Sequence, residues 1–170
     1  MSIWKPPWKG WYKVNVDGAV FKESNCCCVG VVIRNERVQM MGVMCKKLEL
    51  PLGALEVEAK AAEEGIRLAR ELSLSPIIIE GDSQIVLNAI SSPDLPPSSI
   101  KKVIEGIKSW LMHSSDWKSN VVRRSCNVVA HLLARHAKFE SECIIWAEDI
   151  PSMLDYQIQK DVTLSGFVPF

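Results

Sequence analysis

The run of three isoleucines at positions 77 to 79 constrains the fold more than any other feature of the sequence. It stands in "SPIIIEGD", between Pro76 and Gly81. A short, uninterrupted apolar segment bounded by such residues is typical of a strand that is buried on both faces. Strands of this kind are usually parallel and central, so we expect the segment to lie inside a sheet that helices cover.

The segments on either side of this run predict the rest of the architecture. Strand-like segments precede it at residues 11–20, 26–34 and 38–47, and short polar links between them indicate an antiparallel meander. Helical spacing is found over residues 54–74, 83–91, 100–113 and 127–138, with one more strand at 117–122. This order predicts an α/β protein with a mixed five-stranded sheet, three antiparallel strands followed by parallel strands, flanked by helices.

Composition predicts one domain without a membrane segment. The chain has 170 residues, 48% of them hydrophobic, and its 20 basic and 20 acidic residues give zero net charge. We assign residues 1–10 to an extended lead-in, 11–140 to the domain and 141–170 to a C-terminal tail packed on it. No signal peptide and no long apolar run is seen, so we expect a cytoplasmic or nuclear monomer without membrane contact.

Three carboxylates stand where the pattern calls for apolar residues. Asp17 lies at the end of the first strand, Glu58 lies on the apolar stripe of the first helix, and Asp82 follows the isoleucine strand. Each has an ordinary explanation: a turn at Asp17, an ion pair of Glu58 with a lysine, or a helix cap at Asp82. Together on one sheet, they would repel one another unless a cation lay among them. Oxygen ligands of this kind favour Mg²⁺ or Mn²⁺ over zinc.

An ordered set of motifs then points to a known family. The set is "WKPPWKGWYKVNVDGA", "VVIRN", "LEVEAKAAEEGIRLA", "IIIEGDSQIV", "RRSCNVVAHLLARHA" and "WAEDIPSML". The chain resembles, over about residues 4–162, a type 1 ribonuclease H domain of the plant group related to the ribonuclease H segments of non-LTR retroelement reverse transcriptases. The resemblance implies a nuclease that uses two Mg²⁺ ions, with Mn²⁺ as a substitute, to hydrolyse the RNA strand of RNA–DNA hybrids.

The resemblance also implies roles for particular residues. The catalytic and metal-binding acids of the family correspond to Asp17, Glu58 and Asp82, with Glu56 as the weaker candidate for the glutamate. Contacts with nucleic acid are expected from Gly18 and Gln84 to 2′-hydroxyl groups, and from Arg123 and Arg124 to phosphates. The basic residues have an alternative interpretation as ordinary solvated charges.

The sequence departs from the family at two places. The usual fourth acid is replaced by His131, which could still ligate a metal but brings no negative charge. The stretch "SNVVRRSC" also lacks the histidine that many type 1 enzymes carry before the last helix. These departures leave an alternative open, a domesticated module that binds nucleic acid and cuts weakly or not at all. Another nuclease or transposase of the same wide fold, and a small-molecule enzyme, fit the chain length and motifs less well.

Overall fold

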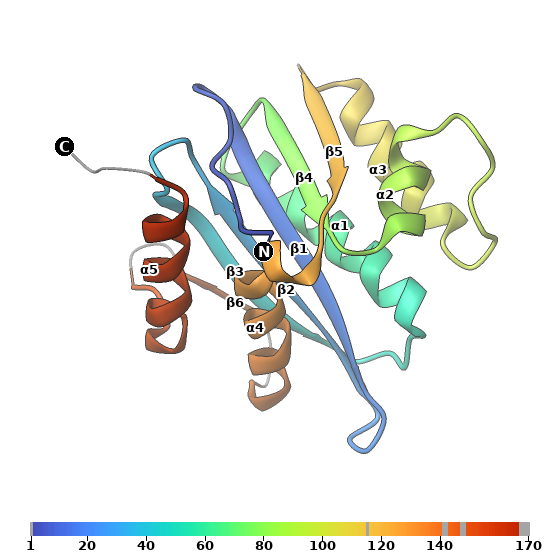
Figure 1. Cartoon of the computed structure of the whole chain (residues 1–170). Helices are drawn as coiled ribbons and strands as arrows, with labels where there is room; N and C mark the ends of the chain where they lie inside the picture. Colours follow the sequence, from blue (N-terminus) through green and yellow to red (C-terminus); the bar gives the residue numbers. More distant parts are fainter. Residues whose placement is uncertain (1, 115, 141–142, 147–148, 167–170) are drawn as a thin grey trace.

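A six-stranded mixed sheet forms the centre of the molecule. The computed structural model describes residues 2–114, 116–140, 143–146 and 149–166. In this part of the chain the strands lie in the order β5-β4-β1-β2-β3-β6 (Figure 1). Their bounds are β1 Tyr12–Phe21, β2 Cys26–Arg34, β3 Met40–Leu48, β4 Ile77–Gly81, β5 Trp117–Val121 and β6 Cys143–Trp146. The expected arrangement is confirmed: β1, β2 and β3 are antiparallel, and β4 and β5 run parallel to β1.

The strand count differs from the expected five because the segment interpreted only as a tail supplies a strand. In it, β6 pairs antiparallel with β3, from Val43 opposite Trp146 to Lys46 opposite Cys143. Its four residues are alternately exposed and half-buried, so they form no fully apolar run that sequence patterning could detect. The sheet therefore extends by one edge strand beyond the predicted meander.

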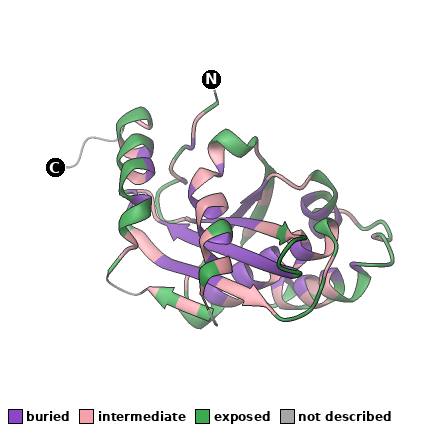
Figure 2. Ribbon diagram, turned by 90° about the horizontal axis from the view of Figure 1, so that it is seen from below, coloured by how far each residue is buried: buried purple, intermediate pink, exposed green. Residues whose placement is uncertain are grey.

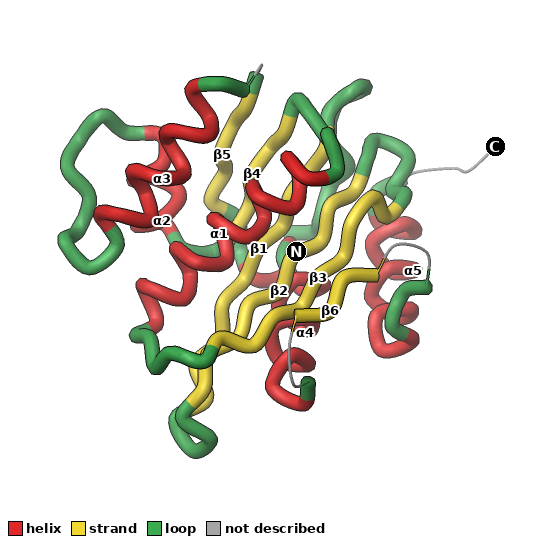
Figure 3. Tube along the Cα trace, turned by 180° about the vertical axis from the view of Figure 1, so that it is seen from behind, coloured by secondary structure: helices red, strands yellow, loops and turns green. Residues whose placement is uncertain are grey.

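Helices cover both faces of the sheet, as Figures 1 and 3 show from opposite sides. The helices are α1 Ala54–Glu71, α2 Gln84–Ser91, α3 Lys101–Met112, α4 Val128–His136 and α5 Asp155–Leu164. One core cluster joins α1, α2 and α3 to one face, and a second joins α4 and the start of α5 to the other. Figure 2 shows the consequence, a sheet whose central strands are buried between helices with exposed outer sides. All nine residues of β2 are buried, which explains its almost wholly apolar sequence.

Two glycines allow helices to approach the central strands closely. A Cβ atom at Gly65 of α1 would lie 2.5 Å from Val16 Cγ1, and one at Gly30 of β2 would overlap the backbone of α4 at Ala130 and Ala134. Real side-chain atoms do not pack at such separations, so glycine is required at both positions. Helix α1 therefore packs closely on β1, and helix α4 packs closely on β2 from the opposite face of the sheet.

The chain on either side of the expected domain packs on the α4 face. In the lead-in, Trp4 is only 1% exposed. Near the other end, Leu154 is fully buried against the second core cluster, and Asp161 of α5 forms an ion pair with Arg34 of β2. No helix among the described residues has the length and apolarity needed to span a membrane.

Candidate active site

Asp17 lies in the middle of β1, not at the end of a strand as the sequence indicated. The strand continues to Phe21, and Asp17 pairs with Gly30 of β2. This pairing rules out the turn that could have explained an aspartate before glycine. The residue is only 2% exposed, so a carboxylate has been placed in the interior of the sheet. Burying a charge in this way is costly unless a partner or a cation compensates it.

The structure distinguishes the two candidates for the catalytic glutamate, Glu56 and Glu58. Glu56 reaches back to the start of α1, where its Oε2 accepts a hydrogen bond from Gly53 N–H at 2.7 Å. Glu58 instead faces β1, and its Oε1 accepts a hydrogen bond from Gly18 N–H at 3.3 Å. A Cβ atom at Gly18 would lie 2.9 Å from the backbone of Val57, so the absence of a side chain lets α1 bring Glu58 to the strand.

Asp82 completes the group from the carboxyl end of β4. It follows Gly81 directly and precedes α2, at the edge where parallel strands present their ligands. Arg124 lies beside it, with Nε 3.5 Å from Asp82 Oδ2. The Arg124 side chain is 68% exposed, so the contact contributes little to stability and leaves the guanidinium in solvent.

The three carboxylates converge on one point. One oxygen from each of Asp17, Glu58 and Asp82 can be chosen so that all lie within 4.8 Å of one another. Burial, assisted by the charges of Asp17 and Asp82, raises the pKa of Glu58 to about 8. Burial also raises the pKa of Asp17, and Asp82 adds to this effect while the hydrogen bond with His131 opposes it. Oxygen donors that destabilise one another's charges are the donor set that a hard divalent cation would relieve.

His131 stands next to this group and contacts one member of it. Its Nδ1 lies 2.8 Å from Asp17 Oδ2, and its side chain is 24% exposed. The residue lies on α4, which approaches Asp17 from the face of the sheet opposite to α1. His131 is not one of the three residues whose oxygens converge. Its contact is with the carboxylate of Asp17, and its role as a ligand stays a prediction.

The four residues expected to contact nucleic acid are exposed or half-buried. Gln84 is the exposed first residue of α2, two positions after Asp82, and Arg123 is exposed just beyond the end of β5. Gly18 is half-buried, and its N–H is already directed at Glu58. Arg124 is the only one of these four predicted residues for which the structure records an ion pair with a carboxylate of the group.

Two buried amides that support the site were not predicted from the sequence. Asn15 is fully buried and contacts Asn127, the residue before α4, through a hydrogen bond of 3.1 Å. Asn15 lies two positions before Asp17 and thus on the same side of β1. The sequence does contain a sign of this role: Asn15 is a polar residue two positions before Asp17, within a strand that helices cover on both faces.

Comparisons with known proteins agree with this fold. The family described as "Reverse transcriptase-like" matches residues 15–137. No curated protein matches significantly. Similar solved structures include ribonuclease H1 from Halobacterium salinarum (20% identity, TM-score 0.70, covering 77% of this chain and 99% of that one). An N-terminal ribonuclease H domain from Mycobacterium tuberculosis has 16% identity and a TM-score of 0.68, with 75% and 92% covered.

A third structure was solved with nucleic acid. It is LC11-RNase H1, isolated from compost by a metagenomic approach, in complex with an RNA/DNA hybrid. It shares 16% identity with this chain at a TM-score of 0.65, over 74% of this chain and 95% of that one. At such identities the likeness concerns the fold, and the family match covers most of the domain. The chain belongs to the reverse transcriptase-like family and has the fold of type 1 ribonuclease H domains.

Proposed function

We propose that the protein is a metal-dependent endonuclease that hydrolyses the RNA strand of RNA–DNA hybrids. The observation that carries the proposal is the convergence of Asp17, Glu58 and Asp82 within 4.8 Å on a ribonuclease H fold. Three carboxylates on separate elements, β1, α1 and the end of β4, serve no evident purpose in packing. The raised pKa values of Asp17 and Glu58 mark a site that favours a bound cation.

The donor set fits two Mg²⁺ ions, with Mn²⁺ as an alternative. Asp17, Glu58 and Asp82 would hold the metal, and His131 would complete the set beside Asp17. When bound, such ions supply an activated water and stabilise the oxygen that leaves the phosphorus. His131 brings no negative charge where an acid is expected, so the site has less negative charge, and affinity for the second ion should be lower.

The chain's own residues hold these ligands in place. Gly18 N–H orients Glu58, and His131 orients Asp17 when its Nδ1 carries the proton. Arg124 lies beside Asp82 and remains exposed, where it could also meet a phosphate of the substrate. A ligand set fixed before the cation and substrate arrive does not have to be ordered during the reaction.

Recognition of a hybrid would use the rim of the site. Gln84 and the backbone at Gly18 are proposed to contact 2′-hydroxyl groups, which distinguish RNA from DNA. Arg123 and Arg124 are proposed to contact phosphates, which would make the affinity depend on salt. The hybrid bound by LC11-RNase H1 supports this choice of substrate.

A second function follows from His131. The protein could bind hybrids without cutting them efficiently, because it lacks the fourth carboxylate and the second histidine of the family pattern. In that case the fold would serve as a nucleic-acid-binding module. The carboxylate cluster would then be a remnant of the ancestral site.

A cleavage assay separates the two functions. A hybrid labelled on either strand is incubated with the protein and Mg²⁺ or Mn²⁺, with Asp17→Asn as the matched variant. If the protein is the proposed nuclease, products should come from the RNA strand alone, and Asp17→Asn should lower the cleavage rate by at least about hundredfold. Binding without products in either metal would favour the module, and cleavage that survives Asp17→Asn would overturn the site.

A further inference from the structure

One turn of α4 is attached to two consecutive residues of β1. Asn127 Nδ2 donates a hydrogen bond to the Val16 carbonyl at 2.8 Å, and His131 Nδ1 lies 2.8 Å from Asp17 Oδ2. These two residues are one helical turn apart, and a backbone hydrogen bond joins them, because His131 N–H donates to the Asn127 carbonyl at 3.1 Å. The position of Asn127 on Val16 therefore determines where His131 stands relative to Asp17.

The Asn127 side chain is held in turn by Asn15. Asn15 Nδ2 donates to Asn127 Oδ1 at 3.1 Å and to Glu80 Oε1 at 3.2 Å. Asn15 is 0% exposed and Asn127 is 1% exposed, so water does not offer these amides alternative partners. Glu80 is itself fixed by an ion pair with Lys13, 3.2 Å away. The two amides thus have one arrangement that satisfies them, and it fixes the start of α4.

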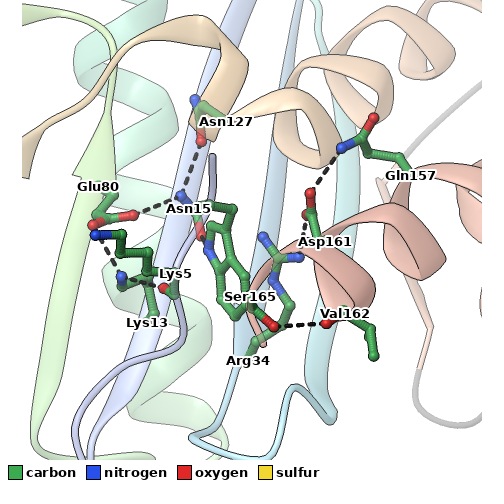
Figure 4. Close-up of polar contacts among 11 residues, drawn as sticks. Lys5, Lys13, Asn15, Arg34, Glu80, Asn127, Gln157, Asp161, Val162 and Ser165 are labelled. Atoms are coloured by element: carbon green, nitrogen blue, oxygen red, sulfur yellow. Dashed lines mark hydrogen bonds and ion pairs between the residues drawn. The ribbon is translucent and has the colours of Figure 1, made fainter. Parts of the chain in front are cut away.

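Trp4 of the lead-in occupies the remaining acceptor of Asn15. Its Nε1–H donates to Asn15 Oδ1 at 3.0 Å, while its ring lies under the guanidinium of Arg34, 3.7 Å from the ring centroid. Figure 4 shows Asn127, Asn15 and Arg34 in this region, and Arg34 also forms an ion pair with Asp161 at 2.7 Å. Residues from both ends of the chain therefore meet at the support of α4.

Histidine at position 131 makes this support necessary. A carboxylate there would be drawn to a bound cation by its charge, whereas an imidazole brings no negative charge that would attract it to the cation. Its placement depends on the helix that carries it. A small rotation or shift of α4 would separate Nδ1 from Asp17 Oδ2, because a hydrogen bond weakens steeply away from its preferred length and angle.

We infer that Asn127 is a positioning residue that sets His131 against Asp17, and that Trp4, through Asn15, holds Asn127 in place. The inference rests on the proposed function for its effect on catalysis. It rests on contacts alone for its effect on the His131 ring. The lead-in, residues 1–10, then helps to position the site through Trp4.

A double-mutant cycle tests whether Asn127 acts through His131. The variants Asn127→Ala, His131→Ala and their combination are compared in hybrid cleavage at saturating Mn²⁺. Asn127→Ala is expected to lower kcat by about tenfold to hundredfold with KM within about twofold, the scale of a ligand displaced by a fraction of an ångström. In the His131→Ala background the same change should cost less than about twofold. Equal losses in both backgrounds would overturn the inference.

The His131 ring provides a readout that is independent of catalysis. The protein has three histidines, so the ring ¹H–¹⁵N signals of His131 can be assigned by substitution. In the metal-free protein, Asn127→Ala should shift or broaden these signals. Unchanged signals in a folded Asn127→Ala protein would overturn the inference. If the wild type cuts nothing, the proposed function fails and this spectrum alone decides the positioning.

Two further variants separate positioning from stability. Trp4→Phe keeps the ring on Arg34 and removes only the donor to Asn15, so it should fold even if Asn127→Ala does not. It should shift the His131 signals and lower kcat by about twofold to tenfold, the equivalent of one neutral hydrogen bond. Thr163→Val removes a hydrogen bond within α5, from the exposed Thr163 hydroxyl to the Gln159 carbonyl, and should leave kcat and the His131 signals unchanged. Failure of Trp4→Phe to move either quantity would remove Trp4 from the inference.

Discussion

His131 Nδ1 lies 2.8 Å from Asp17 Oδ2, so helix α4 touches the central strand β1 at the carboxylate cluster. A histidine at this place leaves the cluster with three carboxylates where the family pattern has four acids. His131→Asp should therefore lower the Mg²⁺ concentration for half-maximal cleavage by about tenfold. That change equals about 1.4 kcal/mol, less than the roughly 4 kcal/mol of two unit charges 4 Å apart at an effective dielectric constant of 20.

His131→Asn is the matched control, since it has the shape of aspartate without its charge. A magnesium titration of the cleavage rate, supported by calorimetry of Mn²⁺ binding, measures the difference. Equal metal dependence of the Asp and Asn variants would show that position 131 does not face the ion.

Glu58→Gln should stabilise the metal-free protein at high pH. The folded-state pKa of Glu58, about 8, lies above its ordinary value of 4.5, so folding is favoured by the protonated form. The stability from this group is fully present below about pH 4.5 and is lost as the pH rises through 8. The gain in free energy of unfolding from Glu58→Gln should grow by about 1–3 kcal/mol between pH 5 and pH 8.

Urea unfolding in EDTA at the two pH values measures this gain. Glu56→Gln, two residues earlier on the same helix and outside the cluster, should show no such growth. Saturating Mg²⁺ should reverse the order, because binding then stabilises the wild type more than Glu58→Gln. A Glu58→Gln protein less stable than the wild type at pH 8 in EDTA would contradict the electrostatics described above.

Arg124→Gln should weaken hybrid binding in a salt-dependent manner. Arg124 is 68% exposed beside Asp82, so its guanidinium is free to meet a phosphate. Loss of one phosphate contact should reduce the slope of log K against log salt by about 1. Fluorescence anisotropy with a labelled hybrid in EDTA measures the slope. Lys101→Gln, at the start of α3, should leave the slope unchanged, and a similar change in both variants would rule out a local contact.

Gly30→Ala should be among the most destabilising small substitutions in this chain. Gly30 pairs with Asp17 across the sheet, and a Cβ atom there would lie 2.5 Å from Ala134 N of α4. Forcing α4 away should cost about 2–4 kcal/mol of unfolding free energy. Gly106→Ala on α3 has open space and should gain about 0.5–1 kcal/mol instead. Thermal unfolding compares the two, and a Gly30→Ala protein as stable as the wild type would contradict the close packing.

Local periodicity predicted the strands and helices of the core because each buries one stripe or both faces in a regular repeat. The Asp17, Glu58 and Asp82 positions could be predicted because charges interrupt those repeats. Local patterns could not predict β6, whose pairing depends on the exposed edge of β3. They also could not show that Trp4, Arg34 and Asp161 meet, because contacts between residues 127 positions apart leave no periodic trace.

The central claim is that Asp17, Glu58 and Asp82 together hold a divalent cation. Crystals grown or soaked in Mn²⁺ test it directly through the anomalous signal of the metal. We predict an anomalous peak among the three carboxylates, bound by an oxygen of each, and its loss in Asp17→Asn crystals treated in the same way. An Mn²⁺-soaked crystal of the wild type with no peak between these residues would contradict the claim.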